Sequence, residues 1–132
     1  LSMIPTSTGA ANAIGRVLPE LKGKLHGSSI RVPTPNVSVI DLAVSTSREV
    51  SIDEVNDAIR QTAAGAMSGV LAFTTEPLVS VDLNHRTESS IVALPQTDVV
   101  DGRMVRVLAW YDNEWSFATR MADTAVAMAK LI

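Results

Sequence analysis

The sequence predicts an α+β fold in which an antiparallel or mixed sheet carries helices on one face. Two observations support this fold class: helical and strand patterns alternate along the chain, and an Asp-Gly pair joins two Val-rich runs as a tight hairpin. Neither a repeat nor a Gly/Ser-rich linker interrupts the 132 residues, a length typical of one domain. We therefore expect residues 1–132 to form a single domain.

The N-terminal segment predicts one helix and one short strand. Ser7 and Thr8 are favourable N-cap residues, and the small residues after them are compatible with a helix. Proline and glycine should end this helix within residues 18–24. Residues 29–32 then alternate polar and apolar side chains, as a short strand does.

A second strand and a second helix follow. Residues 36–46 are rich in Val, Ile and Thr and are apolar on both faces, so we expect this strand to be buried on both sides or bulged near Val39. Ser51 and Glu54 have the spacing of a capping box. Apolar residues at helical spacing continue from there to Gly65.

The C-terminal half predicts several more strands. Two short ones are expected at residues 70–74 and 78–83. Two longer runs, residues 90–100 and 103–110, meet at Asp101-Gly102, which favours a type I′ hairpin.

The last helix is expected to begin near Asn113 and to run to the end of the chain. Its apolar residues recur at intervals of three and four, so they form one stripe: Ala118, Met121, Ala125, Met128 and Ile132. No G-x-G-x-x-G turn stands in a βαβ unit, so the chain has no dinucleotide-binding fold of its own.

Composition excludes several classes of function. The 14 acidic and 11 basic residues give a net charge of −3, which offers no basic footprint for nucleic acid. The chain has no cysteine and therefore no thiol nucleophile, and its two histidines lack a metal-binding spacing. No apolar run is long enough to span a membrane. We expect no metal site and neither a nucleic-acid nor a membrane partner.

Chemistry-bearing residues occur at four places. Thr8 and Gly9 stand at a helix start, where free N–H groups favour phosphate, although an ordinary cap has the same pattern. Arg31 suits a phosphate or a carboxylate, although most arginines are simply exposed. Asn113 stands among aromatic residues at a strand-to-helix junction, where its amide suits either a planar carboxamide or an N-cap. His85 fits a loop or an interface better than acid–base catalysis, because no positioned partner stands beside it.

Five stretches, taken together, give a more specific interpretation. In this order they resemble the C-terminal, catalytic domain of glyceraldehyde-3-phosphate dehydrogenase: residues 2–11 (SMIPTSTGAA), 18–25 (LPELKGKL), 31–39 (RVPTPNVSV), 77–85 (PLVSVDLNH) and 110–115 (WYDNEW). The resemblance covers the whole chain and implies the fold of that domain. Erythrose-4-phosphate dehydrogenases share much of the pattern and are the close alternative.

The resemblance implies roles for four residues. Thr8 and Gly9 match residues that bind the attacking inorganic phosphate, and Arg31 matches an arginine at the phosphate end of the substrate. Asn113 matches the asparagine that orients the nicotinamide carboxamide. The implied cofactor is NAD, or NADP, and the implied ligands are a small phosphorylated aldehyde and inorganic phosphate. The implied enzyme is a cytoplasmic homotetramer of glycolysis, in which residues 82–85 lie between subunits.

Two departures from the family pattern affect these expectations. Ser116 and Phe117 stand where the family usually has glycine and then tyrosine, so Phe117, expected beside the cofactor, keeps the ring and loses a hydroxyl. Ser116 restricts a backbone position that glycine leaves free. Arg86 replaces an acidic residue and reverses a charge near the expected subunit contact.

The resemblance also implies that essential parts lie outside this chain. In the family, the nucleophilic cysteine, its activating histidine and the Rossmann domain that binds NAD precede the segment that matches Leu1. The reaction passes through a cysteine hemithioacetal, hydride transfer to NAD and attack of phosphate on a thioester. We therefore expect the chain, as the C-terminal part of a longer enzyme, to be inactive alone. The alternative is a freestanding, non-catalytic interaction module of the same fold, marked by a large uncovered apolar patch.

Overall fold

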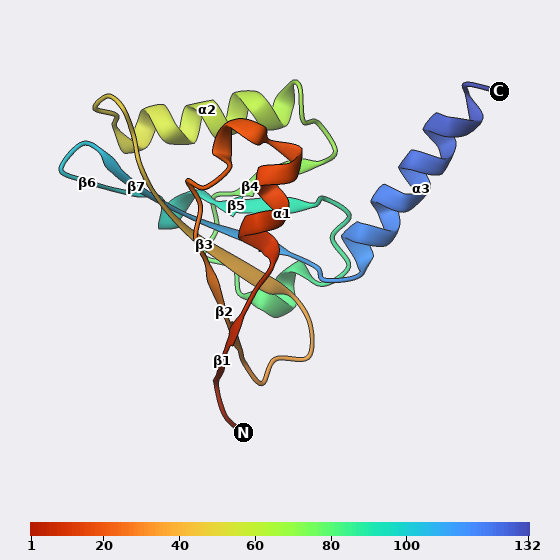
Figure 1. The fold of residues 1–132 in the computed structure, drawn as a ribbon, viewed down its shortest axis with the longest axis horizontal. Helices are drawn as coiled ribbons and strands as arrows, with labels where there is room; N and C mark the ends of the chain where they lie inside the picture. Colours follow the sequence, from red (N-terminus) through yellow and green to blue (C-terminus); the bar gives the residue numbers. More distant parts are fainter. The chain divides into compact units, whose positions relative to one another are not determined.

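The computed structural model describes residues 1–10 and 12–132, which form two compact units, residues 1–35 and residues 36–132 (Figure 1). The first unit contains β1 (Ile4–Ser7), α1 (Ala10–Val17), the 3-10 helix η1 (Pro19–Leu21) and β2 (Ser28–Arg31). None of its described residues is buried. Its two strands are joined by backbone pairing and by a hydrogen bond between the Thr6 and Ser29 hydroxyls at 2.7 Å, with no buried core among the described residues.

The two strands of the first unit form an antiparallel ribbon. Ile4 stands opposite Arg31, and Ser7 stands opposite Ser28. The strand predicted at residues 29–32 is confirmed, one residue earlier. The sequence does not predict β1, because its Ile-Pro-Thr-Ser sequence is short and has no alternation of apolar and polar residues.

The predicted N-terminal helix is confirmed, but Gly9 occupies the N-cap instead of Ser7 or Thr8. The Thr8 hydroxyl still accepts a hydrogen bond from the N–H of Ala10 at 3.2 Å. The helix ends at Val17, one residue before the predicted range of 18–24, and the proline that opens η1 follows at position 19.

The second unit is built on a five-stranded mixed sheet of order β3-β7-β5-β4, with β6 also paired to β7. Its elements are β3 (Ser38–Ser45), α2 (Ile52–Ala64), β4 (Leu71–Thr74), the 3-10 helix η2 (Ser80–Leu83), β5 (Ser90–Ala93), the 3-10 helix η3 (Leu94–Gln96), β6 (Asp98–Val100), β7 (Met104–Tyr111) and α3 (Trp115–Ala129). β4 and β5 are parallel, and β7 is antiparallel to its three neighbours. The predicted fold class is confirmed, and α2 lies along one face of the sheet (Figure 1).

β3 differs from what its apolar faces led us to expect. Its pairing with β7 runs without interruption from Ser38 opposite Tyr111 to Ser45 opposite Met104, so it has no bulge. It is not buried on both sides either, because Ile40 on one face is 51% exposed and Val39 on the other 44%. β3 is an edge strand with a single neighbour, which leaves much of its apolar surface uncovered.

The hairpin between β6 and β7 is confirmed. Asp101 and Gly102 have φ values of 51° and 66°, and positive φ at both central residues is the requirement of a type I′ turn. The run of residues 90–100, expected as one strand, is instead divided into β5, η3 and β6. Pro95 explains the interruption, because it lies in the first turn of η3 and has no N–H for a strand ladder.

The strand expected at residues 78–83 is wrong, because residues 80–83 form the 3-10 helix η2. The Asp82 carboxylate accepts a hydrogen bond from the N–H of Val79 at 2.9 Å and so stabilises the tight turn. The turn places Leu83, which is 1% exposed, in the core. Alternating apolar residues at 79, 81 and 83 therefore imitated a strand.

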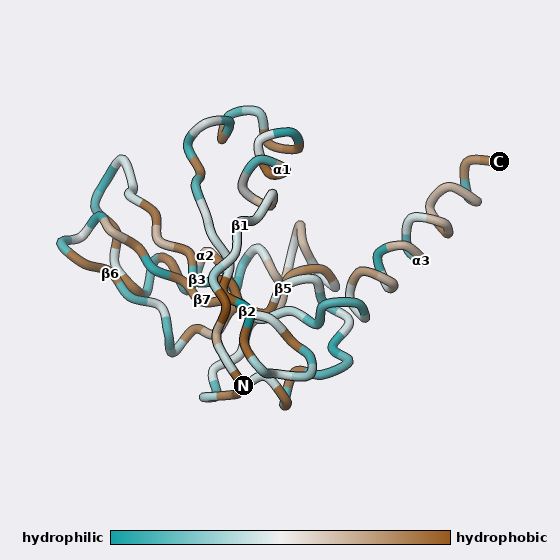
Figure 2. Tube along the Cα trace, turned by 60° about the horizontal axis from the view of Figure 1, so that its bottom comes forward, coloured by the Kyte–Doolittle hydropathy of each residue, from teal (hydrophilic) through white to brown (hydrophobic). Residues whose placement is uncertain are grey.

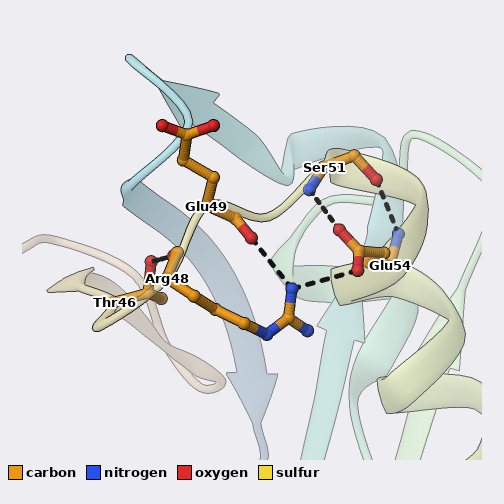
Figure 3. A network of polar contacts seen from close by, with 5 residues as sticks. All are labelled: Thr46, Arg48, Glu49, Ser51 and Glu54. Carbon is orange, nitrogen blue, oxygen red and sulfur yellow. Dashed lines mark hydrogen bonds and ion pairs between the residues drawn. The ribbon is translucent and has the colours of Figure 1, made fainter.

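The predicted capping box starts α2 (Figure 3). The Ser51 hydroxyl accepts from the N–H of Glu54 at 3.2 Å, and a Glu54 carboxylate oxygen accepts from the N–H of Ser51 at 2.8 Å. Arg48 donates to the other Glu54 oxygen at 3.1 Å. The hydrogen bond from Ser51, and then Arg48, lower the pKa of Glu54.

α3 begins two residues later than expected and carries the predicted stripe uncovered. Every residue from Met121 to Ile132 is exposed. Figure 2 shows that hydrophobic and hydrophilic stretches both occur along this helix. The apolar stripe of α3 is therefore surface in this chain.

The core of the second unit brings together the residue before β3, the last residue of η2 and a residue of β5. Val37, Leu83 and Ile91 form a buried cluster, against which Ala72, Leu78 and Trp110 pack. On α2, the buried Asn56 accepts a hydrogen bond from Thr97 at 2.7 Å. This pair joins the helix to the segment after η3.

Candidate functional site

The residues expected to bind phosphate all lie in the first unit. Gly9 has φ −84° and ψ −3°, and a Cβ built on it would meet no atom within 4 Å. Packing within the chain therefore does not require glycine at this position. The Thr8 hydroxyl accepts from Ala10, and its own hydrogen has no acceptor among the residues that the structure describes.

Arg31 ends β2 and is exposed. Among the residues that the structure describes, no ion pair engages its guanidinium. Arg31 stands opposite Ile4, whereas Thr8 follows Ser7 at the other end of the ribbon. Thr8 is four residues from Ile4, which at about 3.4 Å per residue is roughly 14 Å along the chain, so Thr8 and Arg31 fit two anionic groups better than one.

The junction between β7 and α3 is organised by Asp112, which is 1% exposed. One carboxylate oxygen accepts from the N–H groups of Glu114 (3.2 Å) and Trp115 (2.8 Å), at the start of α3. The other oxygen accepts from the side-chain amide of Asn36 (2.8 Å) and the N–H of His85 (3.0 Å). A single buried carboxylate thus joins three segments that are distant in sequence.

Four hydrogen bonds to Asp112 outweigh the effect of its burial. Burial favours the neutral acid and raises the pKa of the Asp112 carboxyl. The hydrogen bonds from Trp115, His85, Asn36 and Glu114 stabilise the carboxylate, and the net result is a lowered pKa. Asp112 is therefore charged near neutral pH, although no cation lies among its hydrogen-bond donors.

Two residues around Asp112 have left-handed backbone. Val37 has φ 68° and His85 has φ 62°. A β-branched residue rarely adopts this conformation, and Val37 is nevertheless 7% exposed within the core cluster. The His85 ring packs on Trp115 with centroids 4.6 Å apart. His85 is thus part of a structured turn, in agreement with its interpretation as a loop residue.

The side chain of Asn113 lies beside this junction and is exposed. Its Oδ1 accepts a hydrogen bond from the Ser38 hydroxyl at 2.8 Å. Its Nδ2 group has no hydrogen-bond partner among the described residues. Phe117, in the first turn of α3, is 65% exposed. A planar amide and an aromatic ring are thus both accessible at the start of α3.

The two departures from the family pattern are accommodated locally. Ser116 is helical and buried, and its hydroxyl donates to the carbonyl oxygen of Asp112 at 2.9 Å, so glycine's conformational freedom is not required. Arg86 forms a two-pronged ion pair with Glu88, with N–O distances of 3.0 and 2.7 Å. Glu88 thus neutralises the charge that Arg86 introduces.

Sequence reasoning missed Asn36, Ser38 and Asp112 as members of this site. Asp112 had one local signal, since an aspartate two or three residues before a helix often accepts its first N–H groups. Asn36 and Ser38 had none, because they lie about 75 residues before their partners.

Within the described residues, no cluster of three or more His, Asp or Glu side chains is able to hold a metal. Among the helices that the structure describes, none is long and apolar enough to cross a membrane.

Comparison with known proteins decides the family. The family described as "Glyceraldehyde 3-phosphate dehydrogenase, C-terminal domain" matches residues 1–113. The chain belongs to the glyceraldehyde-3-phosphate dehydrogenase family. It is 64% identical, over all its residues, to a glyceraldehyde-3-phosphate dehydrogenase of Cereibacter sphaeroides and 61% identical, over 99% of them, to one of Xanthobacter flavus. It spans only 40% and 39% of the length of these relatives.

Membership of this family confirms the interpretation of the five sequence stretches. A glyceraldehyde-3-phosphate dehydrogenase of Geobacillus stearothermophilus is 52% identical to this chain over 97% of the chain. The match covers 38% of the length of that relative. The mixed sheet with its helices is consistent with the C-terminal domain of this dehydrogenase family. The chain therefore corresponds to the C-terminal domain of this family.

Proposed function

We propose that this chain is the C-terminal domain of a phosphorylating glyceraldehyde-3-phosphate dehydrogenase and supplies its phosphate and nicotinamide contacts. The complete enzyme converts aldehyde, phosphate and NAD to acyl phosphate and NADH. The observation that carries the proposal is the family match over residues 1–113, which includes Thr8, Gly9, Arg31 and Asn113. We further propose that the enzyme is a cytoplasmic homotetramer.

The phosphate contacts would come from two places on the first unit. The hydrogen of the Thr8 hydroxyl has no acceptor among the described residues, and the open space at the Gly9 Cα admits an oxygen close to the backbone. This pair suits inorganic phosphate. Arg31, whose guanidinium takes part in no ion pair among the described residues, suits the phosphate of the aldehyde substrate.

The second unit fits the nicotinamide end of the cofactor. Asn113 offers an amide with a free Nδ2 group, and Phe117 offers an exposed ring nearby in sequence. NAD, or NADP, supplies the hydride acceptor when it is bound. The role of Asn113 is to hold the carboxamide of that ring in one orientation.

Kinetics of the complete protein that carries this chain tests the proposal. We expect NAD reduction with glyceraldehyde 3-phosphate and phosphate, and none with the 132-residue chain alone. Arg31→Ala should raise the KM for glyceraldehyde 3-phosphate by roughly 10- to 100-fold, since a charge-assisted hydrogen bond is worth about 1.5–3 kcal/mol. The KM for glyceraldehyde that carries no phosphate group should not change. Arg103→Ala, which removes another exposed arginine, is the matched control.

Three results would contradict the proposal. A natural polypeptide that begins near Leu1 would favour the non-catalytic interaction module. A higher kcat/KM for erythrose 4-phosphate than for glyceraldehyde 3-phosphate would favour the four-carbon enzyme. An unchanged KM in Arg31→Ala, with lower stability only, would remove Arg31 from the substrate site.

A further inference from the structure

The side chain of Asn113 has a support that neither the family match nor the sequence pattern assigns. An asparagine amide carries two lone pairs on Oδ1 and two hydrogens on Nδ2. One lone pair of Asn113 is used by the Ser38 hydroxyl, at 2.8 Å. The other lone pair and both Nδ2 hydrogens remain for a ligand, which is the set that a second planar amide needs for a paired contact.

The backbone keeps Ser38 and Asn113 together. Ser38 is the first residue of β3 and stands opposite Tyr111 at the end of β7. Two residues before Ser38, the Asn36 amide donates to the buried carboxylate of Asp112, the residue before Asn113, at 2.8 Å. The two segments are therefore joined twice, once by a buried charge and once by Ser38. An exposed asparagine without such a bond would rotate among several rotamers.

We infer that Ser38 is a positioning residue that fixes the plane and the orientation of the Asn113 amide for the nicotinamide carboxamide. This inference rests on the proposed function, in which Asn113 contacts the cofactor. Ser38 itself touches no cofactor in this scheme and acts only through Asn113. Loss of its hydroxyl removes an orienting hydrogen bond and leaves the core unchanged, because Ser38 is only half-buried.

The test is binding of NAD to the complete enzyme, compared with binding of ADP-ribose, which lacks the nicotinamide ring. We expect Ser38→Ala to weaken NAD binding by about 3- to 10-fold, the range that one neutral hydrogen bond provides. ADP-ribose binding and the KM for the aldehyde should not change. Ser38→Thr, which keeps the hydroxyl, should restore NAD binding. Ser45→Ala, at the other end of β3, is the matched control.

A double mutant separates action through Asn113 from an independent effect. If Ser38 acts through Asn113, Ser38→Ala adds nothing to Asn113→Ala. Additive effects, equal loss of ADP-ribose and NAD binding, or unchanged NAD binding in Ser38→Ala would each overturn the inference.

The same variants distinguish failure of the inference from failure of the proposed function. If Asn113→Ala weakens NAD binding and Ser38→Ala does not, the role of Ser38 is wrong and that of Asn113 stands. If Asn113→Ala itself leaves NAD binding unchanged, the nicotinamide contact proposed above is wrong.

Discussion

Residues 1–35 contain no buried side chain among those described, whereas residues 36–132 bury Leu83, Ile91 and Asp112 to 1% exposure. The expected phosphate ligands belong to the first unit, and the expected nicotinamide ligand Asn113 belongs to the second. A two-stranded ribbon with one short helix is marginal in water by itself. Short-range hydrogen bonds form the elements of the first unit, whereas in the second unit the buried Asp112 carboxylate also fixes the segments on either side of Asn113 relative to each other.

The largest expected effect comes from truncating one large apolar side chain in each unit, a buried one in the second and an exposed one in the first. Leu83→Ala should lower the free energy of unfolding by roughly 2–5 kcal/mol, because it opens a cavity in the buried cluster. Ile30→Ala, at a position that is 61% exposed, should change it by no more than about 0.5 kcal/mol. Urea unfolding of the purified chain measures both. Equal losses would show that the first unit has a core of its own.

A second test removes the charge that joins three segments of the second unit. Asp112→Asn should cost about 3 kcal/mol near neutral pH, since an amide cannot accept all four hydrogen bonds. Asp101→Asn, in an exposed turn where Asn-Gly is equally favourable, is the control.

The contribution of Asp112 to the free energy of unfolding should depend on pH. Because the folded pKa of Asp112 is lowered, its stabilisation is complete above the ordinary aspartate pKa of about 3.9 and disappears as the pH falls through the folded value. The free energies of unfolding of the wild type and of Asp112→Asn should therefore converge as the solution becomes acidic. A constant difference from pH 7 to pH 2 would mean that the contribution of Asp112 does not depend on its charge.

A smaller test concerns the left-handed Val37, beside the Asp112 network. In an ordinary strand, a protein with glycine is less stable than one with alanine. At φ 68°, however, alanine has a backbone strain of about 1–2 kcal/mol that glycine does not have. We therefore expect Val37→Gly to be at least as stable as Val37→Ala. Thermal unfolding of the two variants checks this order. Greater stability of Val37→Ala would mean that residue 37 is not left-handed in solution.

The smallest expected effect comes from removing a serine hydroxyl at the start of one helix in each unit. Ser51→Ala should cost about 1 kcal/mol, because the Ser51 hydroxyl caps α2. Ser7→Ala should cost less, because Ser7 makes no cap to α1. The helical circular dichroism signal during urea unfolding reports both. Similar losses would show that Ser7 caps α1 in solution.

The features that the sequence predicts well depend on neighbouring residues. The Ser51–Glu54 box and the Asp101-Gly102 turn each lie within four residues, and both formed as expected. η2 was mistaken for a strand because a single bond from Val79 to Asp82 overrides the alternating pattern. The Ser38–Asn113 and Asn36–Asp112 contacts depend on the register of β3 against β7, which no local pattern encodes.

The central position of β7 has a consequence for synthesis on the ribosome. β3, β5 and β6 all pair with β7, yet β7 follows all three in the chain. At roughly 5–20 residues per second, some 3–12 seconds pass between translation of Ser45 and of Met104. During this interval the apolar β3 has no partner on either edge, so the nascent chain exposes a strand that other chains can join. The speed of elongation between β3 and β7 therefore bears on how much of this protein escapes aggregation.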